Sequence, residues 1–318
     1  MRTHSWTDGA DCSTHDEQGK RIGSGSYGEV FQGLLAPAAG AEGQTAVILK
    51  KKKVGLNSTR FFRVEAAICR RLRGNKGVAP FLGVVGADVW LCWEDLGTDT
   101  LESVLQRKQD SKAAPLAPLA EALGCAPGGV ALKTLARRLL RAVSRVHGAN
   151  IIHRDVKPGN ILITEAGKVR LLDLGAAADL QTPINFDPDE AVFDPLWGPP
   201  EQYLDFPSNI SGLIPVRLAW LKYQPDVFDS FSVGMVLLQC AVPYARQTDK
   251  LKKLKQVLVA GADLQGWRDA LPDVAKADFS LLDANAGAGW DLLCKLMAVP
   301  TGKRLSATAA LNHRFVKK

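Results

Sequence analysis

The feature that most constrains this chain is the run at residues 153–162, which reads HRDVKPGNIL. Short β-rich runs flank it, so its polar residues fall on one loop beside a cavity. Phosphoryl transfer needs a carboxylate to orient and deprotonate a hydroxyl, a cation for the transferred phosphate and an amide oxygen for Mg²⁺. Asp155, Lys157 and Asn160 supply these groups in order. The spacing therefore indicates a catalytic loop rather than an ordinary polar surface turn.

A glycine-rich run precedes this loop at residues 22–31, which read IGSGSYGEVF. A dinucleotide-binding fold would require a helix at its third glycine, but the β-rich residues 29–31 follow instead. A P-loop would require Lys and then Ser or Thr where Glu29 and Val30 stand. The remaining phosphate-binding interpretation is a β-hairpin whose glycines let backbone N–H groups approach a triphosphate.

Residues 45–50 are predicted to form a strand that ends on Lys50, and residues 58–72 a helix. On that helix Glu65 falls on the same stripe as Phe61 and Ile68. A carboxylate that points into an apolar core is costly unless it is paired. Glu65 is therefore expected to have a cationic partner elsewhere in the chain.

These elements resemble the eukaryotic-type protein kinases, as do the DLG run at residues 173–175 and the GPPE run at 198–201. The resemblance covers roughly residues 22–316 in the kinase order. It implies an α+β, bilobal fold with a small β-rich N-lobe and a larger, mainly helical C-lobe. The expected divisions are a flexible arm at residues 1–17, the N-lobe at 18–95 and the C-lobe at 96–318. Two insertions are expected within the C-lobe, at 108–129 and 205–224.

The resemblance also implies the roles of the catalytic residues. Asp155 would orient and deprotonate the substrate hydroxyl, and Lys157 would offset charge on the γ-phosphoryl group. Lys50 would hold the ATP phosphates through an ion pair with Glu65. Asn160 and Asp173 would hold Mg²⁺. A lysine at position 157 is typical of Ser/Thr kinases rather than tyrosine kinases.

The nucleotide site implied by the resemblance draws on the glycine-rich hairpin, the lysine strand, the interlobe hinge and the floor of the cleft. Trp93 would be the gatekeeper, and Glu94 and Leu96 would bind adenine through their backbones. The residues expected to contact ATP are Ile22, Gly23, Ser24, Gly25, Ser26, Tyr27, Gly28, Val30, Ile48, Lys50, Glu94, Leu96 and Leu162.

The segment between Asp173 and Glu201 departs from the kinase pattern. Asp194 stands where kinases commonly have a threonine, and it is expected to attract Lys157. Thr182 is the one hydroxyl-bearing residue of this segment. We therefore expect one of its acids to satisfy Arg154, as a phosphate does in other kinases. These acids are Asp187, Asp189, Glu190 and Asp194.

Two longer-range contacts are implied as well. Arg304 is expected to pair with Glu201. Asp229 is expected to brace the catalytic loop from a buried helix that runs to about Cys240. The helix over residues 132–146 is expected to end with Gly148 at its C′ position.

Three runs resemble the thylakoid state-transition kinases of plants and green algae: residues 193–203, 243–249 and 279–293. The resemblance implies a Ser/Thr kinase at the stromal face of the chloroplast thylakoid, acting on threonines near the N termini of light-harvesting antenna proteins. A sister branch that acts on photosystem II core proteins remains an alternative. A nucleotide-binding pseudokinase scaffold is disfavoured, because no metal ligand or catalytic base is missing.

Composition excludes several other classes. Lys and Arg outnumber Asp and Glu by 40 to 33, which is a modest excess, and no basic run is interleaved with aromatics, so nucleic-acid binding is not expected. The six cysteines show no metal-ligand spacing, which favours reduced thiols. No apolar run approaches the length of about 18 residues that a membrane span requires. The family's lumenal cysteine pair and transmembrane helix match no residue here, so membrane proximity would come from elsewhere in a longer protein. A monomeric kinase domain is expected.

Overall fold

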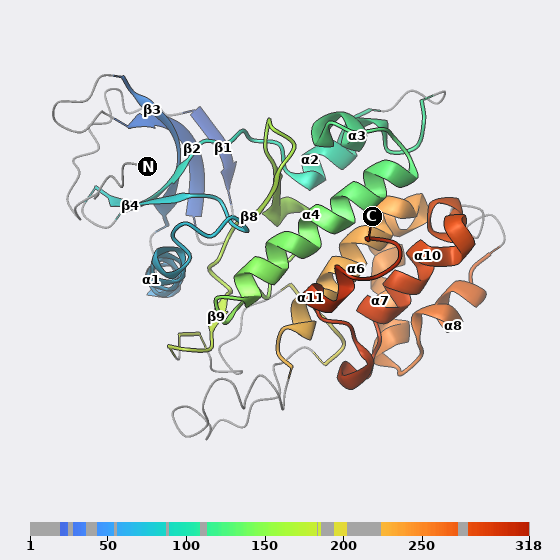
Figure 1. The fold of residues 1–318 in the computed structure, drawn as a ribbon. Coiled ribbons are helices and arrows are strands. Elements are labelled where there is room, and N and C mark those ends of the chain that lie inside the picture. Colours follow the sequence, from blue (N-terminus) through green and yellow to red (C-terminus); the bar gives the residue numbers. More distant parts are fainter. Residues whose placement is uncertain are drawn as a thin grey trace.

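The computed structural model describes residues 20–24, 28–35, 43–53, 56–86, 89–108, 113–182, 184–185, 194–201, 224–272 and 279–317. These residues have the predicted two-lobed α+β architecture, with a β-rich lobe in blue and a helical lobe in green to red (Figure 1). β5 ends at Glu94 and α2 begins at Leu101, so the chain passes between the lobes there. The predicted arm at 1–17 and nearly all of the predicted insertion at 205–224 lie outside the described residues.

The small lobe is a five-stranded antiparallel sheet in the order β1-β2-β3-β5-β4. Its strands are β1 (Lys20–Ser24), β2 (Gly28–Leu35), β3 (Thr45–Lys52), β4 (Phe81–Val85) and β5 (Trp90–Glu94). Side chains alternate between the two faces of a strand. In β3 the buried residues Val47 and Leu49 point to one face, so Ile48 and Lys50 share the opposite face, where both line a cleft.

Helix α1 (Leu56–Arg71) lies beside this sheet (Figure 1). Its predicted apolar stripe is buried, with Phe61 and Ile68 inside the core. Glu65 lies on that stripe as expected and is only 3% exposed. The sequence therefore identified both the helix and its unusual inward carboxylate.

The large lobe is built around α4 and α6, which pack against each other and against α10. Its helices are α2 (Leu101–Gln106), α3 (Ala117–Leu123), α4 (Gly129–His147), α6 (Val227–Ala241), α7 (Thr248–Val259), α8 (Leu264–Asp269), α10 (Ser280–Leu296) and α11 (Ala307–Ala310). The described part of this lobe also contains the short 3₁₀ helices η1 (Pro158–Asn160), η3 (Pro243–Arg246) and η5 (Thr301–Lys303). Nearly every residue of α6 is buried, which is expected of a helix that is apolar on all sides.

Two short two-stranded sheets flank the catalytic run, residues 153–160. β6 (Ile151–Ile152) pairs with β9 (Ala178–Asp179), and β7 (Ile161–Ile163) pairs with β8 (Val169–Leu171). The catalytic run lies between β6 and β7, with η1 at its end. The two β-rich runs predicted from the sequence are therefore real strands.

Two expectations differ from the structure. The predicted loop at 108–129 contains α3, whose Leu119 and Leu123 are buried; a helix this short shows too little periodicity to be recognised. Gly148 does not adopt the left-handed C′ conformation, since its φ is −61°. Asn150 takes the left-handed backbone instead, with φ of 58°, which asparagine tolerates better than most residues.

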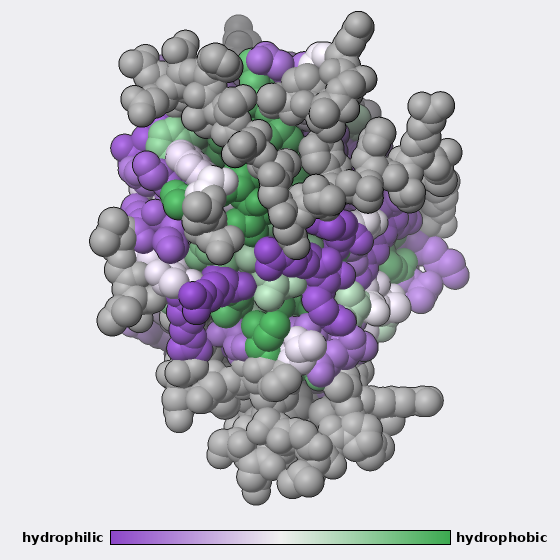
Figure 2. Space-filling model, turned by 90° about the vertical axis from the view of Figure 1, so that its left-hand side faces the viewer, coloured by the Kyte–Doolittle hydropathy of each residue, from purple (hydrophilic) through white to green (hydrophobic). Residues whose placement is uncertain are grey.

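The exposed large apolar side chains among the described residues lie on four different elements: β1, β2, α4 and α7. They are Ile22, Leu34, Val130 and Val259. On the small-lobe side, apolar residues lie among hydrophilic ones (Figure 2). Within the described residues, no helix is long and apolar enough to cross a membrane.

Candidate active site

A cavity of about 430 Å³ opens between the small-lobe strands and the catalytic run. Its size lies in the range of roughly 300–1,000 Å³ that small-molecule sites occupy. Most of the residues predicted from the sequence to bind nucleotide or metal line it, as does Glu65, the predicted partner of Lys50. These are Ile22, Gly23, Ser24, Val30, Ile48, Lys50, Glu65, Glu94, Leu96, Asn160, Leu162 and Asp173.

Gly28 does not line this cavity and has a steric role instead. A Cβ atom at Gly28 would lie 2.9 Å from Cγ of Lys50, so only glycine lets β2 pass this close to the lysine. Gly25, Ser26 and Tyr27 lie outside the described residues.

Several lining residues were not predicted, among them Cys69, Thr100 and Glu102. Cys69 could have been found, because it follows Glu65 at i+4 and so shares its helix face. Thr100 is the N-cap of α2 and accepts a hydrogen bond from the Ser103 N–H group. Nothing in the sequence distinguishes Thr100 and Glu102 from ordinary polar loop residues.

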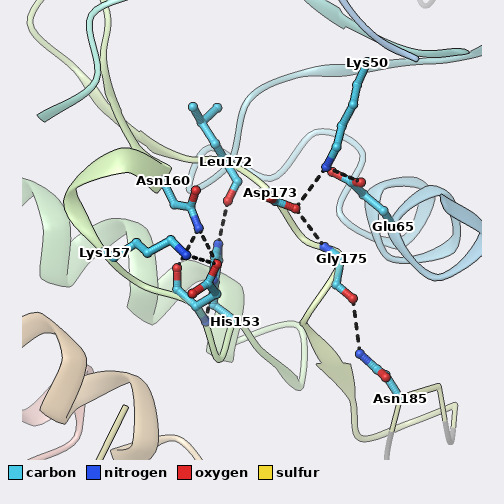
Figure 3. A network of polar contacts seen from close by, with 10 residues as sticks. Lys50, Glu65, His153, Lys157, Asn160, Leu172, Asp173, Gly175 and Asn185 are labelled. Carbon is cyan, nitrogen blue, oxygen red and sulfur yellow. Dashed lines mark hydrogen bonds and ion pairs between the residues drawn. The ribbon is translucent and has the colours of Figure 1, made fainter. Parts of the chain in front are cut away.

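Lys50, Glu65 and Asp173 form one charged cluster in the cleft (Figure 3). The Nζ atom of Lys50 lies 2.8 Å from Oε2 of Glu65 and 3.1 Å from Oδ1 of Asp173. Burial disfavours the charged ammonium, but the two carboxylates outweigh this cost and raise the pKa of Lys50. The lysine therefore keeps a full positive charge for anionic ligands at neutral pH.

Asp173 follows β8 in an unusual backbone conformation, with φ of 54°. Burial opposes ionisation of its carboxyl, but Lys50 outweighs that effect and holds the pKa of Asp173 below its ordinary value. The next residue, Leu174, is buried in the core. A strained aspartate held as a carboxylate at the cleft is suited to bind a cation.

The catalytic run brings Asp155, Lys157 and Asn160 together, as predicted. Oδ2 of Asp155 accepts a hydrogen bond of 2.7 Å from Nδ2 of Asn160 and lies 2.9 Å from Nζ of Lys157. Burial raises the pKa of Asp155 above its ordinary value, although Lys157 opposes the shift. A carboxylate with a raised pKa is a stronger general base than an ordinary aspartate.

The residues at the cleft also fit a divalent cation. Asn160 uses its amide nitrogen toward Asp155, donating to the backbone carbonyl as well, which leaves its amide oxygen for a metal. The described residues contain no cluster of three His, Cys, Asp or Glu that could hold a metal by themselves. This donor set suits Mg²⁺, which is usually held by one or two protein oxygens together with phosphates and water.

Asp229 in α6 braces the catalytic run from below, as expected. Its carboxylate accepts hydrogen bonds of 2.8 Å from the backbone N–H groups of His153 and Arg154, and it lies 2.8 Å from Nε2 of His147. Burial alone would raise the pKa of Asp229, but these hydrogen bonds hold it below its ordinary value. Arg154 has a φ of 64°, so the carboxylate stabilises a backbone turn that is costly for a residue other than glycine.

The residues predicted for the hinge lie at the end of β5 and just after it. Trp93 pairs with Ile48 across β3 and β5, and both side chains line the cavity. The Trp93 ring packs against Phe81, with centroids 5.5 Å apart. Glu94 and Leu96 line the same cavity.

Asp194 was one of the acids expected to pair with Arg154, and the structure places it elsewhere. Oδ2 of Asp194 lies 3.6 Å from Nζ of Lys157, so this acid approaches Lys157, as was also expected, and not Arg154. Arg154 is buried, and its Nε donates to the carbonyl of Ala176. The other candidate acids, at positions 187, 189 and 190, lie outside the described residues. Lys157 is the nearer cation because Asp194 begins a turn directly beside the catalytic run.

The far end of the same segment is held by the predicted pair of Glu201 and Arg304. Nη1 and Nη2 of Arg304 donate to the two oxygens of Glu201 at 2.6 and 3.0 Å. The guanidinium also packs over the ring of Phe231. This bidentate contact fixes the segment to the core of the large lobe.

The fold and this site together indicate the class of protein to which the chain belongs. A family model described as a protein kinase domain matches residues 17–316. The chain therefore belongs to the protein kinase family, and the predicted kinase fold is confirmed. It is a Ser/Thr protein kinase domain related to two chloroplast kinases of Arabidopsis thaliana, STN7 and STN8.

The chain is 33% identical to STN7 over 322 residues and 32% identical to STN8 over 343 residues, with 93% of the chain covered in each case. It spans 56% of the length of STN7 and 69% of that of STN8. Among solved structures, a Stt7 homolog from Micromonas algae, soaked with ATP, matches with a TM-score of 0.83 and 30% identity. That match covers 100% of this chain and 96% of the other.

Proposed function

We propose that this domain transfers the γ-phosphoryl group of Mg-ATP to threonine or serine hydroxyls of thylakoid light-harvesting antenna proteins. Its site of action would be the stromal face of the thylakoid membrane. Support for the location comes from the two chloroplast relatives. Support for the nucleotide comes from the related structure that was soaked with ATP.

The observation that carries the chemistry is the free oxygen of Asp155. Oδ2 is held by Asn160 and Lys157, whereas Oδ1 is buried and has no hydrogen-bond partner among the described residues. A buried carboxylate oxygen without a partner is costly unless a ligand supplies the donor. A substrate hydroxyl is such a donor, and Oδ1 would accept its proton as the oxygen attacks phosphorus.

The surrounding cations would each stabilise negative charge on a different part of the triphosphate. Lys50, fixed by Glu65, would bind the α- and β-phosphate oxygens. Lys157, beside Asp155, would offset charge on the transferred group. Magnesium ions, when bound by Asp173 and Asn160, supply further positive charge to the phosphate oxygens.

A second candidate substrate class is the photosystem II core proteins. The near-equal identities to STN7 and STN8 do not favour either branch of the family. A third alternative, a scaffold that binds nucleotide without turnover, is disfavoured because Lys50, Asp155, Asn160 and Asp173 are all present and brought together.

The test is transfer of labelled γ-phosphate from Mg-ATP to three acceptors. These are an antenna N-terminal peptide that contains threonine, a core-protein N-terminal peptide and dephosphorylated casein. Asp155→Asn removes the base, and Asp269→Asn, at an exposed position in α8, is the matched control. We expect transfer to the antenna peptide, a loss of roughly 10²–10⁴-fold in the base variant and no loss in the control.

Each other result has a defined meaning. Preferred transfer to the core peptide would move the assignment to the second candidate. Transfer only to casein would retain the kinase and reject both thylakoid substrates. Nucleotide binding without transfer to any acceptor would support the scaffold.

A further inference from the structure

Helix α7 carries a lysine in the interior of the large lobe. Lys255 is 7% exposed and lies among the buried leucines of this helix, whereas Lys253 on the same helix is exposed. Its Nζ atom donates a hydrogen bond to the carbonyl of Gly198 and lies 5.0 Å from the centroid of the Phe231 ring. Burial of an amine is costly, so this contact calls for an explanation other than packing.

Gly198 closes a turn that begins at Asp194. The N–H groups of Trp197 and Gly198 both donate to the backbone carbonyl of Asp194 at 3.1 Å. The Leu196 N–H group donates to Oδ1 of the Asp194 side chain, also at 3.1 Å. The turn is therefore a compact hydrogen-bonded unit, and Lys255 holds the carbonyl at its end.

The other side of this turn faces the catalytic base. Oδ2 of Asp194 lies 3.6 Å from Nζ of Lys157, which lies 2.9 Å from Oδ2 of Asp155. A continuous series of contacts thus runs from Lys255 through Gly198, Asp194 and Lys157 to Asp155. The series ends at Oδ2 of Asp155, which leaves Oδ1 of the same carboxylate for a protein hydroxyl.

Helix α6 contacts both ends of this series, the catalytic run and Lys255. Asp229 accepts hydrogen bonds from the backbone of the catalytic run. Two positions later, the ring of Phe231 lies against both Lys255, which binds Gly198, and Arg304, which binds Glu201. The segment 194–201 is consequently held at two points, Gly198 and Glu201, by two cations on one ring.

We propose that Lys255 is a positioning residue, which holds the 194–198 turn so that Asp194 keeps Lys157 beside Asp155 for transfer to a protein hydroxyl. Its effect should be confined to the protein acceptor, because no residue of α7 lines the nucleotide cavity. The proposal rests on protein kinase activity and not on the identity of the antenna substrate.

The test compares Lys255→Met with Lys253→Met, which removes an exposed lysine from the same helix. Steady-state rates are measured with casein as acceptor, varying casein and Mg-ATP separately. We expect Lys255→Met to lower kcat/KM for casein by roughly 10- to 100-fold, as a small misplacement of reacting groups does. The KM for ATP should not change, and Lys253→Met should match the parent. Lys255→Arg keeps a charged donor and should recover part of the loss.

A double-mutant cycle gives a second, independent readout. Asp194→Asn alone should reproduce the effect on casein, and Lys255→Met should add little in that background, because both act through one series of contacts. Additive losses would overturn the proposal. So would an unchanged kcat/KM in Lys255→Met, or a parallel change in the KM for ATP. If thermal unfolding shows that Lys255→Met does not fold, Lys255→Gln replaces it in the same comparison, with the same outcomes.

Casein keeps this test separate from the proposed function. Failure of the parent on the antenna peptide alone would contradict the thylakoid substrate and leave the casein comparison valid.

Discussion

Nζ of Lys50 lies 2.8 Å from Oε2 of Glu65, joining β3 to α1 across the wall of the nucleotide cavity. The side chain of Glu65 is 4% exposed and that of Lys50 is 15% exposed, so water screens this pair weakly. The pair fixes the position of the lysine that is proposed to bind the ATP phosphates.

Glu65→Gln should lower kcat/KM for phosphoryl transfer by roughly 10²-fold, because Lys50 would no longer be held at the phosphates. The change would also leave Lys50 with Asp173 alone, so the lysine should compete with the metal for that carboxylate. Steady-state kinetics with casein checks this. Glu121→Gln, at an exposed position in α3, is the control. Parental kinetics in Glu65→Gln would show that the pair is dispensable.

Asp173→Asn should weaken the binding of ATP in the presence of Mg²⁺ more than in its absence. The reason is that Mg²⁺ binds carboxylates strongly, and loss of this carboxylate leaves only Asn160 as a proposed protein ligand. Calorimetric titration of ATP with and without Mg²⁺ measures the difference. Equal losses under both conditions would mean that Asp173 acts through Lys50 and does not bind the metal.

Arg304→Met should destabilise the fold. The Arg304 side chain is fully buried, and its removal leaves the Glu201 carboxylate, which is 27% exposed, without its bidentate partner. Breaking a buried pair costs about 3–5 kcal/mol, and the partial exposure of Glu201 places this case near the lower end. Urea unfolding of the parent and variant gives the change. A loss well below 1 kcal/mol would show that water satisfies Glu201.

Lys255 should give the domain a distinctive pH dependence. Burial lowers the pKa of Lys255 to about 8 from its ordinary 10.5, with Glu201 opposing the shift and Arg304 adding to it. The folded chain thus binds this proton less tightly than the unfolded chain. The charged amine therefore lowers stability below pH 8, and this penalty disappears as the pH rises from 8 to 10.5.

The free energy of unfolding of the parent should consequently rise relative to Lys255→Met between about pH 7.5 and about pH 9.5. Urea unfolding at both pH values measures this difference, and Lys253→Met should follow the parent. A constant difference between parent and Lys255→Met would mean that Lys255 keeps its proton throughout.

Much of the site could be predicted because its functional side chains lie close together along the sequence. The catalytic run places Asp155, Lys157 and Asn160 within a few residues, so their meeting on one loop hardly depends on the rest of the fold. Glu65 was recognisable because helical periodicity directs it inward, where a carboxylate requires a partner. The pairing of Glu201 with Arg304, far apart along the chain, followed only from the family pattern.

What the sequence did not indicate depends on packing between distant segments. α3 is too short for its periodicity to be read, and the left-handed residue after α4 was Asn150 rather than Gly148. Asp194 was expected near either Lys157 or Arg154, and the turn that it begins decided for Lys157.

By itself, the sequence determined the chemical groups at the catalytic centre through the short-range spacing of its motifs, and the class of fold through the family resemblance that those motifs carry. The tertiary structure decided which of those groups are buried, paired or left free. Oδ1 of Asp155 is without a partner because Asn160 and Lys157 both occupy Oδ2. Lys255 falls on the apolar stripe of α7 with Leu251, Leu254 and Leu258, and the tertiary structure decided its partners, which are the carbonyl of Gly198 and the ring of Phe231.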